Sequence, residues 1–188
     1  MKKTISLLII TFFLLTNSLA YGEANILFSK VGIQPIHDKK KLPDVCLKGL
    51  KGENVKFRDF QGKTIFLNFW ATWCGPCKEE MPSMEALYQQ FKDRDFALIT
   101  ISVDYEGVEP VRKFIEKNRY NFTALVDPAA KTLGLFQINK IPTTFIIDKK
   151  RRIIGRSIGP RNWSSRDAFS FFEYLLDDKT NKVVLIKD

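Results

Sequence analysis

The order of apolar and polar positions along the chain predicts alternating strands and helices. Residues 64–70 are nearly all apolar, β-branched or aromatic, and residues 96–103 form a second run of this kind. Such runs are typical of strands covered on both faces of a parallel sheet. Between them, apolar residues recur at spacings of three and four up to about Lys92, which predicts a helix.

The remaining elements complete a layered order, β-β-β-α-β-α-β-α-β-β-α. This order predicts one α/β domain whose mixed central sheet is flanked by helices. Ser164 and Asp167 resemble a capping box at the start of the last helix. The other expected elements are an N-terminal hairpin at 45–47 and 55–57, a helix from Glu109, a strand at 124–126, a strand pair at 143–148 and 152–157, and a strand at 183–186. A short helix is expected between the strand at 124–126 and the strand pair; Asp127 caps it, Pro128 opens it, and it reaches about Leu135. The last helix is expected to start at Ser164 and to bury Ala168, Phe169, Phe172, Leu175 and Leu176.

The first residues have the pattern of an export signal. Lys2 and Lys3 precede the apolar stretch 5–15, and small residues allow a cut after Ala20 or after Ala24. The apolar run is shorter than the roughly 20 residues of a membrane-spanning helix, and an uncleaved anchor is the alternative. We expect a signal peptide or anchor at 1–20 (to 24 with the later cut), a linker at 25–41, the domain at 42–178 and a tail at 179–188.

This export pattern places the working domain outside the cytoplasm, in the periplasm or at the outer face of the inner membrane. The chain has 188 residues and a formal charge of +9, from 30 Lys and Arg against 21 Asp and Glu. The basic residues are spread along the chain, apart from short runs at 39–41 and 149–152. We interpret them as solvated surface and expect no nucleic-acid partner, because no nucleic-acid motif accompanies them.

The cysteines carry the clearest chemistry. Cys74 and Cys77 lie where the buried strand 64–70 turns into a helix, so their side chains share one helix face within bridging distance. The helix N-terminus favours the Cys74 thiolate, the attacking species in disulfide exchange. Cys77 lies one turn further in, placed to resolve a mixed disulfide. Pro76 is tolerated in this first turn, and Trp73 offers an apolar contact surface beside the sulfur.

The same cysteine spacing has other interpretations. It is also found in half a zinc site or in a structural clip, but a metal site needs more ligands. Cys46 and His37 are the further candidates, and neither has metal-site spacing to the pair. A disulfide that encloses two residues constrains the unfolded chain little, so redox work is favoured, with no metal and no cofactor. Cys46 alternates with apolar neighbours and is expected to face away from the core as a spectator, with a regulatory or intermolecular disulfide as the alternative.

Three stretches together resemble a known family. Residues 66–82 look like the active-site region of the thioredoxin superfamily, and 141–148 and 159–163 resemble its later motifs. More narrowly, the chain is similar, from about Leu42 to Leu176, to the exported thiol-disulfide oxidoreductases of the TlpA/ResA type. The resemblance implies a thioredoxin fold with a helix-containing central insertion, which matches the elements expected between about Gly107 and Leu135.

The resemblance also implies roles for particular residues. Cys74 matches the nucleophile and Cys77 the resolving cysteine of a redox-active disulfide. Pro142 matches a proline that follows a cis peptide bond and faces the pair, and the backbone of Ile141 would pair with an extended substrate segment. Taken alone, 141–142 would more commonly mark the start of a strand. The substrate-contacting set is Trp73, Gly75, Pro76, Ile141 and Pro142.

Two further positions concern the proton. Asn68 stands where cytoplasmic thioredoxins carry a buried aspartate, and an amide does not titrate. Glu80 matches an acid of the exported subfamily and would serve as acid and base if burial raises its pKa. The alternative is an exposed helix glutamate like its neighbour Glu79.

The resemblance extends to function. It implies an oxidoreductase whose clients are proteins with cysteines or disulfides, among them cytochrome c apoproteins and copper-site proteins, with electrons from a membrane thiol carrier. Gly75, Pro76 and Ile141 resemble reducing thioredoxins, so we expect a reductase. The alternatives are a thiol oxidant, a copper-delivery module on the same fold, or a peroxiredoxin-type peroxidase. The last has a Pro-x-x-x-Thr-x-x-Cys pattern, whereas Thr72 lies two residues before Cys74 and the proline is absent.

Overall fold

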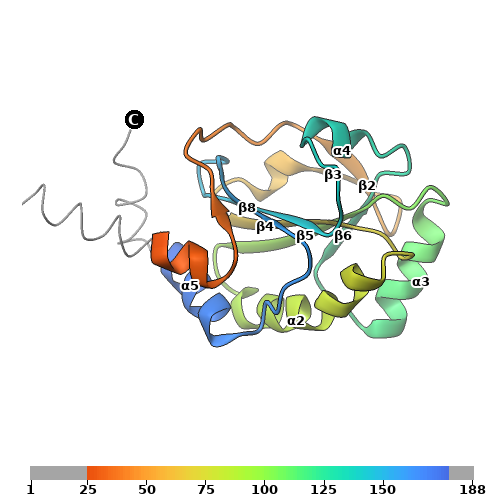
Figure 1. Ribbon diagram of the computed structural model, residues 1–188. Helices are drawn as coiled ribbons and strands as arrows, with labels where there is room; N and C mark the ends of the chain where they lie inside the picture. Colours follow the sequence, from red (N-terminus) through yellow and green to blue (C-terminus); the bar gives the residue numbers. More distant parts are fainter. Residues whose placement is uncertain (1–24, 178–188) are drawn as a thin grey trace, which may run out of the picture.

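The computed structural model describes residues 25–177, and an eight-stranded mixed sheet forms its centre (Figure 1). The strand order is β1-β8-β7-β4-β5-β6-β2-β3, with β4, β5 and β6 parallel and the other pairs antiparallel. The sheet confirms the predicted mixed α/β architecture. The strands are β1 (Gln34–Pro35), β2 (Cys46–Gly49), β3 (Asn54–Lys56), β4 (Thr64–Trp70), β5 (Phe96–Ser102), β6 (Thr123–Val126), β7 (Thr143–Ile147) and β8 (Ile153–Ile158).

Helices cover both faces of this sheet. In Figure 1, α2 (Gly75–Phe91), α3 (Val108–Asn118) and α5 (Arg166–Leu176) lie on one face. The 3-10 helix η1 (Phe57–Phe60) and α4 (Lys131–Leu135) lie on the other. All seven residues of β4 and all seven of β5 are buried, as their apolar sequences predicted.

The two faces of β4 supply two separate cores, because side chains alternate along a strand. Phe66 and Trp70 pack with Met81 and Phe172 under α2 and α5. The alternate residues of β4 pack with η1 and with the segment after α4; this second core includes Ile65, Leu67, Phe69, Phe57 and Phe136. Asn68 interrupts the apolar series on the α2 face and is fully buried.

The segment expected to be a linker, 25–41, packs on the domain instead. Residues 25–30 are helical, and β1 pairs with β8. The ring of Phe28 lies edge-on against Phe171 of α5, with centroids 4.9 Å apart. Gly155 of β8 allows this approach, since a Cβ there would lie 2.6 Å from Ile33 and 2.8 Å from Phe28. The apolar residues of the segment 25–41 are too few among polar neighbours to give a periodic signal.

The start of α4 also differs from the prediction. The helix begins at Lys131, after Ala130 at a φ of 51°, and not at Pro128. Asp127 does not cap a helix opened by Pro128. Its Oδ2 accepts hydrogen bonds from the backbone N (2.7 Å) and Oγ1 (2.6 Å) of Thr132, five residues later.

The N-cap of the last helix lies one residue beyond the predicted one. Ser165, not Ser164, is the N-cap of α5, and its Oγ accepts from the backbone N of Ala168 at 3.2 Å. Ser164 instead donates its hydroxyl to Asn162 Oδ1 at 2.8 Å. Phe171 belongs to the buried face, whereas Phe169 is only partly covered.

Two predicted segments lie outside the described residues: the signal or anchor at the N-terminus and the strand at 183–186. Within residues 25–177, none of the helices combines the length and the apolar character that a membrane crossing requires.

Candidate active site

Cys74 and Cys77 form a disulfide at the junction of β4 and α2, where the sequence placed them. Cys74 is the N-cap of α2, and its Sγ accepts from the backbone N of Cys77 at 3.3 Å. The exposed fraction is 7% for Cys74 and 1% for Cys77. Cys74 is therefore the more exposed residue of the pair, and it lies at the end of the helix whose dipole and free amides favour an anion.

The backbone around the pair holds Cys74 at the helix end. The backbone N of Cys74 donates to Ala71 O at 3.1 Å, which closes a turn after β4, and Cys74 O accepts from Lys78 N at 3.2 Å. Pro76 lies in the first turn of α2, where its missing N–H leaves no intrahelical bond unmade. Trp73 is 62% exposed, so an apolar ring stands in solvent directly before the first cysteine.

The peptide bond between Ile141 and Pro142 is cis. Pro142 precedes β7, and its carbonyl accepts from Gly159 N at 2.8 Å. β7 runs antiparallel to β4, with Thr143 opposite Phe69 near the end of β4. This register brings the 141–142 loop to the edge of the sheet from which the chain turns toward Cys74.

Glu80 is buried under α2, with 3% of its surface exposed. Its Oε1 accepts from Asn68 Nδ2 at 2.8 Å, and its Oε2 accepts from Trp163 Nε1 at 2.9 Å and from Arg161 N at 3.1 Å. Burial raises the pKa of Glu80 to about 7, against the opposing effect of these hydrogen bonds. It therefore differs from the exposed Glu79 beside it, and it follows Cys77 by one helical turn.

Asn68 joins three elements at the centre of the site. Its Nδ2 donates to Glu80 on α2 and also to Thr144 Oγ1 of β7, at 2.9 Å. Its Oδ1 is buried and has no hydrogen-bond partner among residues 25–177. The sequence indicated Asn68 as a departure from the usual aspartate, but it pointed to no role for Thr144.

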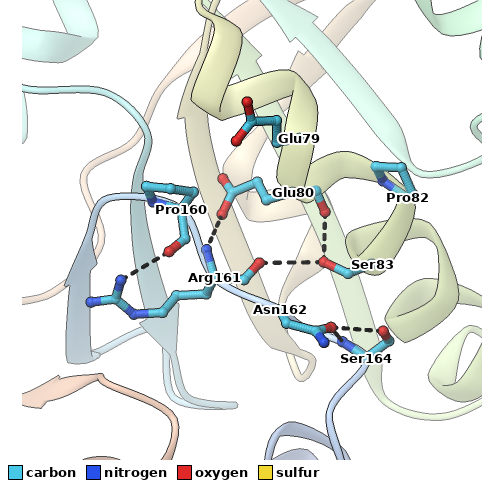
Figure 2. A pocket seen from close by; sticks show the side chains of 8 residues that line it. All are labelled: Glu79, Glu80, Pro82, Ser83, Pro160, Arg161, Asn162 and Ser164. Atoms are coloured by element: carbon cyan, nitrogen blue, oxygen red, sulfur yellow. Dashed lines mark hydrogen bonds between the residues drawn. The ribbon is translucent and has the colours of Figure 1, made fainter.

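The loop between β8 and α5 makes contacts with α2 at this site that the sequence did not predict. Figure 2 shows Arg161 N directed at the Glu80 carboxylate, and Ser83 between Glu80 O (2.6 Å) and Arg161 O (3.4 Å). Ser83 Oγ also accepts from Trp163 N at 3.0 Å. An open hollow of about 510 Å³ lies between this loop and the first turns of α2. The sequence motif 159–163 was the available signal, but a motif does not name its partners.

The other metal-ligand candidates lie elsewhere. Cys46 is a free, exposed cysteine on β2, and β5 and β6 separate β2 from β4. Its exposure agrees with the alternation argument. His37 lies between β1 and β2. In the part of the chain that the structure describes, no three His, Cys, Asp or Glu side chains are grouped to hold a metal ion.

The fold and the cysteine pair define a thiol-disulfide oxidoreductase of the thioredoxin-like class, as comparison with known proteins shows. The chain belongs to the AhpC/TSA family of this superfamily, whose model matches residues 39–156. It is 33% identical over 120 residues to the thiol-disulfide oxidoreductase ResA of Bacillus cereus, covering 64% of this chain and 69% of that protein. For ResA of Bacillus subtilis, the identity is 32% over 137 residues, covering 73% and 75%.

Solved structures agree with this assignment. A Chlorobium tepidum protein described as the thiol:disulfide interchange protein DsbE superposes with a TM-score of 0.67 at 29% identity, over 73% of this chain and 96% of that one. StoA of Bacillus subtilis superposes with a TM-score of 0.59 at 25% identity, over 68% and 96%. The thioredoxin fold expected from the sequence is confirmed.

Proposed function

We propose that this protein is an exported reductase of client-protein disulfides, in which Cys74 attacks and Cys77 resolves. The observation that carries the proposal is the unequal pair at the start of α2. Cys74 is at the N-cap and the more exposed, while Cys77 is buried one turn further in. A nucleophile needs access and a stabilised thiolate, whereas a resolving thiol needs only to reach its partner.

The first step forms a mixed disulfide. In the reduced protein, the Cys74 thiolate attacks one sulfur of a client disulfide, so that a new bond joins Cys74 Sγ to that sulfur and the client S–S bond breaks. The second client sulfur leaves as a thiolate and takes a proton from solvent. The Cys77 backbone N–H, which lies 3.3 Å from Cys74 Sγ in the disulfide form, is a donor suited to the Cys74 thiolate before attack.

The second step releases the client. Cys77 loses its proton and attacks Cys74 Sγ, which re-forms the internal disulfide and frees the first client sulfur as a thiolate. Two electrons have then passed from the cysteine pair to the client. Glu80 is the proposed acceptor of the Cys77 proton, because a buried carboxyl with a pKa of about 7 exchanges protons readily near neutral pH.

Client docking is proposed at the end of the sheet where β4 leads into Cys74. Trp73 offers an exposed ring, Gly75 and Pro76 present little side chain beside the sulfur, and the backbone of Ile141 before Pro142 is suited to pair with an extended segment. This mode of binding recognises the backbone of the client more than its side chains, so it suits a partly unfolded client such as a cytochrome c apoprotein. Cytochrome c maturation is therefore the proposed context.

Export and the electron source belong to the proposal as well. The basic start and apolar stretch 5–15 support a working domain in the periplasm or, if the N-terminus is retained, on the outer face of the inner membrane. An extracytoplasmic reductase must be re-reduced after each turnover. A thiol carrier in the membrane is the class of donor that can bring electrons across.

A Cys77→Ser trap in the native compartment tests the proposal, with Cys74→Ser as the matched control. Without its resolving thiol, Cys74 should retain clients as mixed disulfides, which non-reducing gels separate and mass spectrometry identifies. The Cys74→Ser protein should capture none of them. Adducts formed through Cys46, or equal capture by both variants, would contradict the assigned roles.

A further inference from the structure

A buried carboxylate lies next to the active-site turn, outside the groups used so far. Asp104 follows β5 and is 3% exposed. Its Oδ1 accepts from Thr72 Oγ1 at 2.5 Å, and its Oδ2 accepts from Thr72 N at 2.9 Å. Ser102 donates its hydroxyl to the same carboxylate. The side chain thus grips both the backbone and the hydroxyl of one residue on the neighbouring loop.

Thr72 lies inside the turn that ends at the nucleophile. That turn is closed by the hydrogen bond from Cys74 N to Ala71 O, with Thr72 and Trp73 at its centre. On its other side, Asp104 belongs to the continuation of β5, where Val103 N still donates to Trp70 O at 3.0 Å. We call the hydrogen bonds between the Asp104 carboxylate and Thr72 the clamp. The clamp holds the turn to the sheet just before Cys74, the N-cap of α2.

We infer that Asp104 is a positioning residue for Cys74 and acts through Thr72. The inference rests on the proposed role of Cys74 as the nucleophile. With the turn fixed, Cys74 Sγ stays at the helix N-terminus within reach of the Cys77 N–H, which stabilises the thiolate. Without the clamp, the turn gains freedom, the sulfur spends less time at this position, and the thiolate fraction falls.

The chain supplies a matched control with the same chemistry at another place. Asp127 follows β6 as Asp104 follows β5, and it accepts from both the backbone N and the hydroxyl of Thr132. Both carboxylates are buried. The Asp127 clamp holds α4, however, which packs on the face of the sheet opposite to α2.

The test is the alkylation rate of the reduced full-length protein with iodoacetamide, with modified peptides assigned by mass spectrometry and folding followed by circular dichroism. Thr72→Val and Asp104→Asn should each slow Cys74 alkylation about tenfold near neutral pH, the size expected for one hydrogen bond to a charged group. The midpoint of the pH profile of alkylation should move upward. Thr72→Ser, which keeps the hydroxyl, should react as the wild type, and Thr132→Val and Asp127→Asn should leave the rate within about twofold.

Results other than these would overturn either the positioning role of Asp104 or the proposed function. A wild-type rate in folded Thr72→Val, or an equal loss in Thr132→Val, would overturn the positioning role. Faster reaction of Asp104→Asn with no change in Thr72→Val would mean that Asp104 acts only by its charge, which also overturns it. If Thr72→Val does not fold, the comparison of Thr72→Ala with Thr72→Ser decides instead. Preferential alkylation of Cys77 in the wild type would refute the proposed function itself, a separate outcome.

Discussion

Trp163 donates its indole N–H to the buried carboxylate of Glu80 at 2.9 Å, from a position 83 residues further along the chain. The same ring packs edge-on against Phe66 of β4, with centroids 4.8 Å apart. The loop before α5 is thus held to the site by both an apolar and a polar contact. This pairing makes the protonation of Glu80 depend on residues remote in sequence from the cysteines.

Removal of the indole donor should raise the pKa of Glu80 further. Trp163→Phe keeps an aromatic ring against Phe66 but removes a hydrogen bond that lowers this pKa. We expect an upward shift of about one pH unit, measured as the titration of the Glu80 carboxyl carbon by NMR. Trp73→Phe, at an exposed tryptophan, is the control and should leave the titration unchanged. An unaltered Glu80 pKa in Trp163→Phe would show that the indole does not tune it.

Glu80 should also make stability depend on pH. Its pKa is raised from 4.5 to about 7 on folding, so the folded protein binds this proton more tightly than the unfolded chain does. The free energy of unfolding should therefore fall as the pH rises from about 4.5 to about 7, by about 3 kcal/mol from this carboxyl alone. Glu80→Gln, which does not titrate, should remove that part of the slope in urea unfolding curves.

The control for this prediction is Glu79→Gln, a change at the exposed neighbouring glutamate. It should keep the slope of the wild type. Asn68 can adapt to the amide introduced at position 80, because an amide flip would turn its buried, unpartnered Oδ1 toward the new N–H group. Identical pH slopes in Glu80→Gln and the wild type would contradict the raised pKa.

Trp73 should matter for protein clients and not for small thiols. Its ring is 62% exposed beside Cys74, so a docked client would cover it. Trp73→Ala should raise KM for insulin disulfide reduction by about tenfold, the loss of one apolar anchor, and leave the reaction with dithiothreitol unchanged. Leu135→Ala, at an exposed leucine of α4, is the control. Equal losses in both reactions would indicate damage to the cysteine pair and not to docking.

Gly155→Ala should loosen the segment 25–33 from the domain. The added Cβ would lie 2.6 Å from Ile33 and 2.8 Å from Phe28, closer than packed carbons allow. We expect a loss of about 1–3 kcal/mol in the free energy of unfolding and faster proteolysis near residue 30. Gly134→Ala in α4 meets no atom within 4 Å and should be neutral or stabilising. Equal stability of the two variants would mean that this packing contributes little.

Local pattern was sufficient for much of the fold. β4 and α2 could be predicted because a fully apolar run and a period of three to four residues report burial directly. The same two elements fixed the place of Cys74 and Cys77. The N-cap of α4 could not be predicted in this way, because Ala130 adopts a left-handed φ and an alanine side chain gives no sign of that conformation.

Contacts between segments that are distant along the chain could not be predicted from the sequence. The spacing of Glu80 after Cys77 suggested an acid, but its burial depends on the 159–163 loop, which no local pattern brings to α2. The grip of Asp104 on Thr72 likewise arises only when β4 and β5 pair in register. The sequence predicts a linker around Phe28 because the partner of this ring, Phe171, lies at the other end of the chain.

The reduction potential of the Cys74–Cys77 pair tests the central claim, that this protein reduces its clients, most directly. It is measured by equilibrating the purified protein with thiol–disulfide buffers and quantifying the alkylated, reduced form. We predict a value close to that of a reducing thioredoxin, about −270 mV. A value near that of a strong oxidant of the same fold, about −120 mV, would contradict the account.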